Sequence, residues 1–280
     1  MSGLRRLCSV AGGLMVAVHG GASHGALPGA PGSSHARVAI EAGAESFRWR
    51  ETDDEGRRLL TEQGPRFVLG AVLGNFLHAD GGPIFEMRLG GLLGEVDYDG
   101  QDNNGRFVGT TSDYSGWSGE VNGGYRIPDL VAGVTIDFFG GVGLDNWRRE
   151  INGGVNSIGQ SVSGFTEEYD VEYLRYGIGI LLRDASPGSY LQMGFRRPRS
   201  IGEQVRIQGQ TIYLSPGENA SAFLSYQVAL GPPGASGSYV KFYYRGYRLG
   251  KSEIDQIGSS QVWQPSSDAD TLGVMLGFRY

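Results

Sequence analysis

The chain has 280 residues, of which 48 are glycine, 11% are aromatic and 19% are charged, and its formal net charge is −6. A soluble domain this rich in glycine would lose much backbone entropy on folding and bury few side chains in return. The acidic balance, and the lack of a glycine-rich phosphate loop between a strand and a helix, exclude a nucleic-acid-binding protein.

The first 22 residues have the layout of a secretory signal peptide. Arg5 and Arg6 precede a short apolar run, Leu7 to Val18, and the small residues at 20–22 follow it. The run is too short to cross a membrane as a helix. We therefore expect residues 1–22 to be a signal peptide and residues 23–36, rich in Gly, Pro and Ser, to be a flexible tail. The one cysteine, Cys8, falls within the segment that would be removed.

From residue 37 to the end, apolar and polar residues alternate with a period of two, which is typical of strands with one apolar face. The alternation predicts ten strands, at 38–49, 67–73, 85–93, 114–127, 131–147, 173–182, 191–196, 222–228, 240–245 and 272–280. Phe47 and Trp49 stand near the end of the first strand, where we expect an aromatic belt at the membrane interface. In the fifth strand, Phe139 falls on the polar face.

The connections between these strands alternate in length. Long polar connections are expected at 50–64, 97–105, 146–166, 198–219 and 250–269, and short turns at 78–82, 128, 184–189 and 231–237. All the long loops would thus lie at one end of the sheet. Since an unpaired strand edge inside lipid costs several kcal/mol per backbone group, the first and last strands must pair.

The last strand ends the chain on an aromatic residue. Its apolar face carries Leu272, Val274, Leu276, Phe278 and Tyr280. This segment resembles the closing strand of Gram-negative bacterial outer-membrane β-barrels, in which such an ending is read by the barrel-assembly machinery. The resemblance implies an all-β fold over residues 37–280: a closed antiparallel transmembrane β-barrel of ten strands, with short periplasmic turns and long extracellular loops. It also implies location in the outer membrane, with membrane lipid, lipopolysaccharide and the assembly machinery as partners.

The opposite faces of the strands carry charges that would line the lumen. These residues are Glu41, Glu45, Glu86, Arg88, Glu120, Arg126, Asp137, Arg175, Arg196, Lys241, Arg245 and Arg279. Because a small barrel is filled by its own side chains and buried charges must be paired, we expect an internal ion-pair network. The function would then be structural, or an interaction with extracellular ligands through the loops. A narrow porin-like channel for small solutes is the alternative, and the excess of bases would favour anions.

An enzyme is the third hypothesis, because ten strands and this length resemble the omptin proteases. Outer-membrane barrel enzymes depend on a catalytic histidine. The four histidines here are His19 and His24 in or near the signal peptide, His35 in the tail and His78 in a short turn. The paired Asp and the Asp–His pair of the omptins find no matching positions. We therefore expect no catalytic site, no metal and no cofactor.

Overall fold

The computed structural model describes residues 37–75, 81–102, 104–131, 133–182, 189–207, 209–231, 237–257 and 260–280. The predicted signal peptide (1–22) and tail (23–36), together with His78, lie outside these residues. Within the described ranges, no helix has the length and apolar character needed to cross a membrane.

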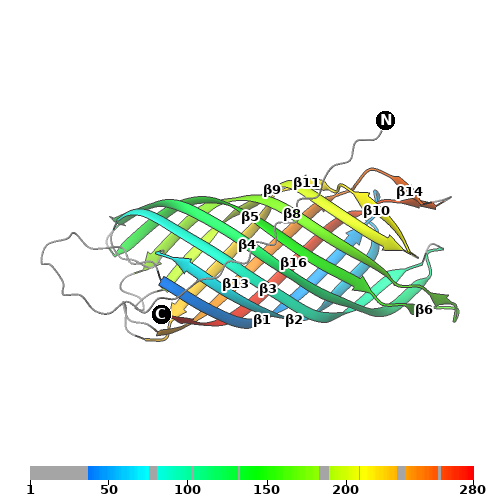
Figure 1. Ribbon diagram of the computed structural model, residues 1–280, viewed down its shortest axis with the longest axis horizontal. Helices are drawn as coiled ribbons and strands as arrows, with labels where there is room; N and C mark the ends of the chain where they lie inside the picture. The colour runs from blue at the N-terminus through cyan, green and yellow to red at the C-terminus, as the bar shows by residue number, and fades with distance from the viewer. Residues whose placement is uncertain are drawn as a thin grey trace, which may run out of the picture. The chain divides into compact units, whose positions relative to one another are not determined.

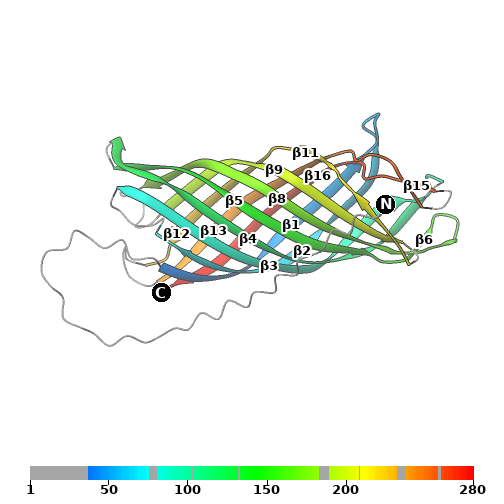
Figure 2. The same cartoon turned by 45° about the horizontal axis from the view of Figure 1, so that its top comes forward.

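Ten long antiparallel strands close into a barrel, as predicted (Figures 1 and 2). They are β1 (Arg37–Thr52), β2 (Arg58–Gly74), β3 (Gly82–Gln101), β4 (Phe107–Val131), β5 (Val134–Ile151), β8 (Phe165–Leu182), β9 (Ser189–Ile207), β12 (Ser221–Ala229), β13 (Gly237–Gly250) and β16 (Ser266–Arg279). Each strand pairs with the next of this set, and β16 pairs with β1.

The pairing of β16 with β1 covers nearly all of β1. Its register extends from Ala39 opposite Arg279 to Thr52 opposite Ser266. The last residue is also paired, because the Tyr280 amide donates to the Val38 carbonyl at 2.9 Å. The barrel thus has no open edge along this seam, which a lipid environment requires.

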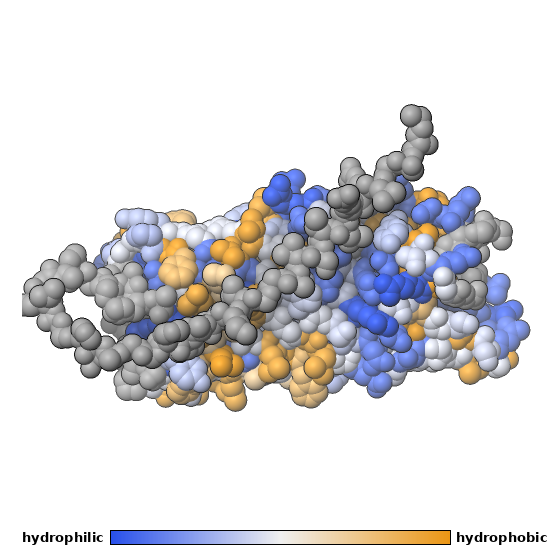
Figure 3. All heavy atoms as spheres, viewed as in Figure 1, coloured by the Kyte–Doolittle hydropathy of each residue, from blue (hydrophilic) through white to orange (hydrophobic). Residues whose placement is uncertain are grey.

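A belt of exposed apolar side chains surrounds one half of the barrel. Val38 and Ile40 on β1 are 47% and 55% exposed, and the outward residues of the final strand, 272–280, are 43–66% exposed. In Figure 3 the hydrophobic residues gather over the half that holds the C-terminus, and the hydrophilic residues over the half that holds β6, β10 and β14. The apolar half has the character of a lipid-facing surface.

Beyond the belt, the outward side chains become charged while the inward ones become apolar. On β3, Glu95, Asp97 and Asp99 are exposed, whereas Val96 and Tyr98 between them are buried. This is the pattern of a strand with water outside and a core inside. The part of the barrel beyond the belt, which we call the extracellular extension, therefore stands in water.

This reversal corrects the bounds of the five predicted long connections, each of which is shorter than the sequence indicated. The first of them, 50–64, contracts to residues 53–57 between β1 and β2, and β5 and β9 continue to Ile151 and Ile207. The second contracts to residues 102–106, and the connections after β5, β9 and β13 contain six short strands: β6 (Gly154–Asn156), β7 (Ser161–Val162), β10 (Gln210–Leu214), β11 (Gly217–Asn219), β14 (Asp255–Ile257) and β15 (Ser260–Val262). Many of the polar residues that we predicted to lie in loops are therefore on the solvent-facing side of strands.

Inward glycines make room for tyrosine rings on the neighbouring strand. Tyr239 is paired with Gly277 and Tyr243 with Gly273. At either glycine, an added Cβ would collide with the ring of its tyrosine. Close packing of aromatic rings on glycine accounts for part of the high glycine content, since a larger residue would push the ring off the wall.

Candidate functional site

All twelve charged residues expected in the lumen lie on the inner face of the barrel. Nine of them are buried, and Arg88, Glu120 and Arg245 are half-buried. The lumen is therefore the candidate functional site, and its chemistry depends on how these charges are paired.

At the level of the apolar belt, carboxylates on β1 collect cations from several strands. Glu41 accepts hydrogen bonds from the Lys241 ammonium and from the Tyr239 hydroxyl, the latter at 2.8 Å. Arg88 binds Glu86 through Nε and Nη2 at 2.6 and 2.7 Å, and its Nη1 lies 3.8 Å from Glu41. Such pairing is what makes buried charge tolerable.

Further along β1, Glu45 is held by Arg66, whose Nε and Nη2 lie 2.8 and 2.5 Å from Oε1. The Tyr243 hydroxyl donates to the other oxygen of Glu45 at 2.5 Å. Arg66 also lies over the Phe47 ring, 3.7 Å from its centroid. Arg66 was missed in the sequence because it falls next to a stretch that read as loop.

The other wall of the lumen carries three more ion pairs. Arg126 binds Asp137 bidentately, with both distances 2.7 Å, and the Tyr190 hydroxyl donates to Asp137 at 2.6 Å. Arg175 donates to Glu120, and Arg196 donates to Asp145. The last of the predicted residues, Arg279, lies 5.4 Å from the ring centroid of Tyr239.

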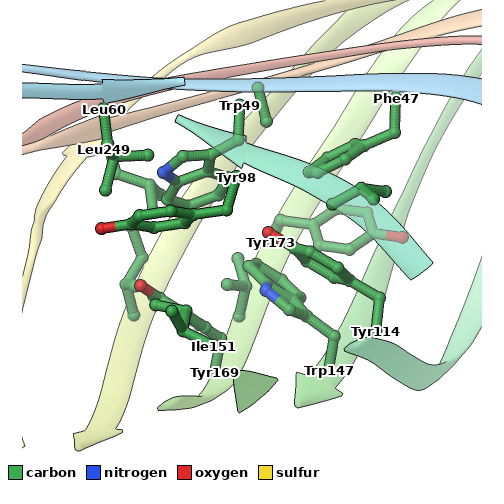
Figure 4. Close-up of a cluster of buried hydrophobic side chains, with 14 residues drawn as sticks. Phe47, Trp49, Leu60, Tyr98, Tyr114, Trp147, Ile151, Tyr169, Tyr173 and Leu249 are labelled. Carbon is green, nitrogen blue, oxygen red and sulfur yellow. The ribbon is translucent and has the colours of Figure 1, made fainter. Parts of the chain in front are cut away.

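On the side of these ion pairs that is farther from the C-terminus, aromatic side chains cross the lumen (Figure 4). Trp49 on β1 meets Tyr169 on β8 with ring centroids 5.8 Å apart, although the two strands are five steps apart in either direction around the ring. Trp147 stacks on Tyr169 at 4.9 Å and contacts Tyr247 at 5.3 Å. We call the buried cluster around these rings the aromatic layer.

The aromatic layer corrects the prediction of an interfacial belt at Phe47 and Trp49. Their side chains are 4% and 1% exposed and point into the lumen. They share the inward face with Glu41 and Glu45, because β1 continues without a bulge as far as Glu51. The strand β1 continues beyond the apolar belt. Its inward aromatic side chains therefore pack on other aromatic rings in the lumen and do not lie at the lipid headgroups.

Beside the aromatic layer, inside the extracellular extension, four glutamates gather around one arginine. Arg149 reaches Glu51 (3.0 Å), Glu62 (3.0 Å) and Glu167 (2.7 Å), and it is fully buried. Glu62 also accepts hydrogen bonds from Ser112, at 2.5 Å, and from Tyr114. We call this set, completed by Glu203, the carboxylate cluster; one guanidinium is too little charge to balance four carboxylates.

Burial of these carboxylates beside one another raises the pKa of two of them. Burial raises the pKa of Glu167 to about 7, with Arg149 opposing and Glu51 adding to the rise. Burial raises the pKa of Glu203 to about 9, reinforced by Glu167 and Glu51. Both shifts follow from removing a negative charge from water beside other negative charges.

Gln264 links the carboxylate cluster to the β14–β15 hairpin. With its amide turned to satisfy both neighbours, its nitrogen donates to the two Glu203 oxygens at 3.0 and 3.2 Å and its oxygen accepts from Ser267 at 2.7 Å. At the base of the hairpin, the Ser252 amide donates to the Gln264 carbonyl at 3.0 Å, and the Gln264 amide donates to the Ser252 hydroxyl oxygen at 2.8 Å. The members Glu51, Glu62, Glu203 and Gln264 lay in predicted loops, which is why the sequence did not indicate them.

Between the aromatic layer and the pairs nearer the C-terminus lies a cavity of about 190 Å³. Its charged lining consists of Arg66, Arg88, Arg175, Arg196, Lys241 and Arg245, with Glu41, Glu120 and Asp145. Among the described residues, no group of three or more histidine, cysteine or acidic side chains is arranged to hold a metal ion.

Comparison with known proteins gives a fold and no closer relationship. No family model matches the chain, and no curated protein matches it. Among solved structures, the outer membrane protease OmpT from Escherichia coli aligns over 87% of this chain and 96% of its own, with a TM-score of 0.54 and 11% identity. An outer membrane channel from Pseudomonas putida F1 (88% and 95% covered, 9% identity) has a TM-score of 0.37. The translocator domain of the autotransporter NalP from Neisseria meningitidis (87% and 88%, 10%) has 0.40.

The likeness to OmpT extends over most of both chains and agrees with a closed β-barrel fold. At 11% identity it supports the architecture and says nothing of catalysis. The chain therefore has the fold of an outer-membrane β-barrel protein.

Proposed function

We propose that this barrel is closed to the diffusion of solutes and has a structural or surface-interaction role through its extracellular extension. The contact of Trp49 with Tyr169 carries the proposal, because their strands face each other across the ring. Rings that meet from opposite walls interrupt the water column that a pore requires. The neighbouring Arg149 and Glu62 are 0% exposed, which supports the same conclusion.

The extracellular extension would present the connecting segments to the surroundings. On β4, the stretch from Phe107 to Ser115 lies beyond the belt and corresponds to about 30 Å of strand at about 3.3 Å per residue. We propose that outer-membrane lipid, lipopolysaccharide and extracellular ligands contact this region, and that the barrel-assembly machinery recognises the final strand.

A narrow porin-like channel remains the second candidate because of the cavity. Its six cationic side chains against three carboxylates would favour small anions. For this candidate to hold, the aromatic layer must open during conduction.

We further propose that the protein is not an enzyme. The carboxylate cluster has the residue types of an acid–base site, but Glu62 and Arg149 are 0% exposed and the other members are buried as well. A general acid must come within hydrogen-bond reach of its substrate. Their burial supports a structural role for the cluster.

Planar-bilayer recordings separate the closed barrel from the channel. We expect the pure refolded protein to give no unitary conductance steps, and the double variant Trp49→Ala/Tyr169→Ala to give them. Trp117→Ala is the matched control, because Trp117 is 50% exposed on the outer face. Reproducible steps from the unaltered protein would establish the channel and overturn the closed-lumen proposal.

A further inference from the structure

Two arginines at the extracellular end of the cavity have hydrogen-bond donors without acceptors. Arg196 is 4% exposed and binds Asp145 through Nη2. Its Nε and Nη1 find no acceptor in the described part of the chain, and neither does Nε of Arg245. The nearest carboxylate to Arg245 is Glu45, at 3.7 Å. Buried donors without partners are rare in native proteins and require an explanation.

The two guanidinium groups lie beside the same tyrosine ring. The Cζ atoms of Arg196 and Arg245 lie 4.9 and 5.9 Å from the centroid of the same Tyr247 ring. Arg196 also lies 3.7 Å from the ring centroid of Tyr173. The positive charges of Arg196 and Arg245 repel each other, and more strongly in the barrel than they would in water. The carboxylate of Asp145 neutralises part of this positive charge. Its Oδ2 accepts hydrogen bonds from Arg196 and from the Tyr247 hydroxyl.

The cavity as a whole is also short of negative charge. Its lining has six cations and three carboxylates. Glu45 and Glu86 stand behind it and pair with Arg66 and Arg88. That makes five carboxylates for six cations, a balance of +1. The volume of about 190 Å³ has room for about six water molecules at about 30 Å³ each, and so for a small hydrated anion.

We propose that this cavity is a binding site for a small oxyanion, a carboxylate or a phosphate, held between Arg196 and Arg245. Guanidinium groups present N–H donors in a fixed fork, which matches two oxygens of either anion. A bound oxyanion would satisfy the three donors left without acceptors and relieve the repulsion between the arginines. Asp145 faces the same place and opposes the anion, so it sets the affinity.

Calorimetric titration of the full refolded chain tests the site, with inorganic phosphate and acetate as probes and chloride at equal ionic strength as the reference. We expect saturable binding of at least one probe, weakened at least tenfold by Arg196→Gln and by Arg245→Gln. Asp145→Asn should tighten it, because the variant removes the opposing charge and keeps the shape. Arg148→Gln, on the outer face, is the matched control and should bind as the unaltered protein does.

The opposite signs of the Asp145 and arginine variants distinguish binding from general damage, since a misfolded barrel would lose affinity in all of them. Adding the probe before refolding and after it covers an anion that enters only during assembly. Saturation by phosphate but not acetate assigns the site to phosphate, and the reverse assigns it to carboxylates. Lack of saturable binding of both probes in both orders of addition, or equal affinity in Arg196→Gln and the unaltered chain, would overturn the proposal.

Discussion

Replacing Glu203 with glutamine should remove much of the pH dependence of stability. The side chain is buried beside Glu167 and Glu51, with Arg149, Tyr169 and Gln264 also facing it. Its pKa rises from 4.5 to about 9 on folding. Between these values the folded chain retains a proton that the unfolded chain has released, so stability falls as pH rises and levels off above the folded pKa. Glutamine has the same shape and never ionises.

The size of the effect follows from the shift. One pH unit in this window costs about 1.4 kcal/mol for each such group. From pH 5 to pH 8, Glu203 alone would remove about 4 kcal/mol from the free energy of unfolding. Glu167, whose pKa is raised to about 7, adds a smaller loss that ends near that pH. The Glu203→Gln variant should keep only the smaller loss of stability that comes from Glu167.

The measurement is urea unfolding of the refolded barrel in lipid vesicles at pH 5, 6, 7 and 8, followed by tryptophan fluorescence. Glu95→Gln is the control, because Glu95 is exposed on the outer face of the extracellular extension. We expect a steep fall of stability with pH for the unaltered chain and for Glu95→Gln, and a shallow one for Glu203→Gln. Parallel slopes for the unaltered chain and Glu203→Gln would refute the reasoning.

Three further outcomes test other parts of the barrel. Arg149→Met leaves three glutamates without their cation and should cost about 3–5 kcal/mol in unfolding free energy, while Arg148→Met, on the outer face, should cost little. Gly273→Val pushes the Tyr243 ring off the wall and should lower stability by about 1–3 kcal/mol; Gly123→Ala, where an added Cβ meets nothing, should not. Deleting Phe278–Tyr280 should reduce the fraction of heat-modifiable barrel on gels, and normal membrane insertion of the truncated chain would contradict the role of this ending.

The period of two was enough to predict the ten strands and their two faces. Within the belt, lipid outside and charge inside give every strand one apolar face, so the positions of Glu41 or Arg175 follow from counting along the strand. Beyond the belt the same strands have charge outside and apolar residues inside. Val96 and Tyr98 alternate with Glu95 and Asp97, and this reversal hid the strand within an acidic stretch. A search for alternation of either sign would have found it.

The contacts across the lumen could not be predicted in this way. Trp49 and Phe47 have the same parity along β1 as Glu45, so an uninterrupted strand would have placed them inside. That Trp49 meets Tyr169, however, depends on which strands face each other and on the stagger between them. Those quantities are set by strand number and register around the whole ring. Local patterns hold no information about them.

The polar contacts in the lumen also add a constraint that apolar packing would not supply. A slip of two residues between neighbouring strands keeps every side chain on its correct face, so alternation alone cannot prevent it. Glu62 on β2, however, binds Ser112 on β4 and Arg149 on β5, and Arg149 reaches Glu51 on β1. These bonds join strands that are not neighbours, so they form only when all the strands between them are in register. A slipped barrel would leave the charges buried and unpaired, at a cost of several kcal/mol each. Apolar side chains of equal volume would fill the same space and give the barrel similar stability, but they would not prevent a two-residue slip between strands.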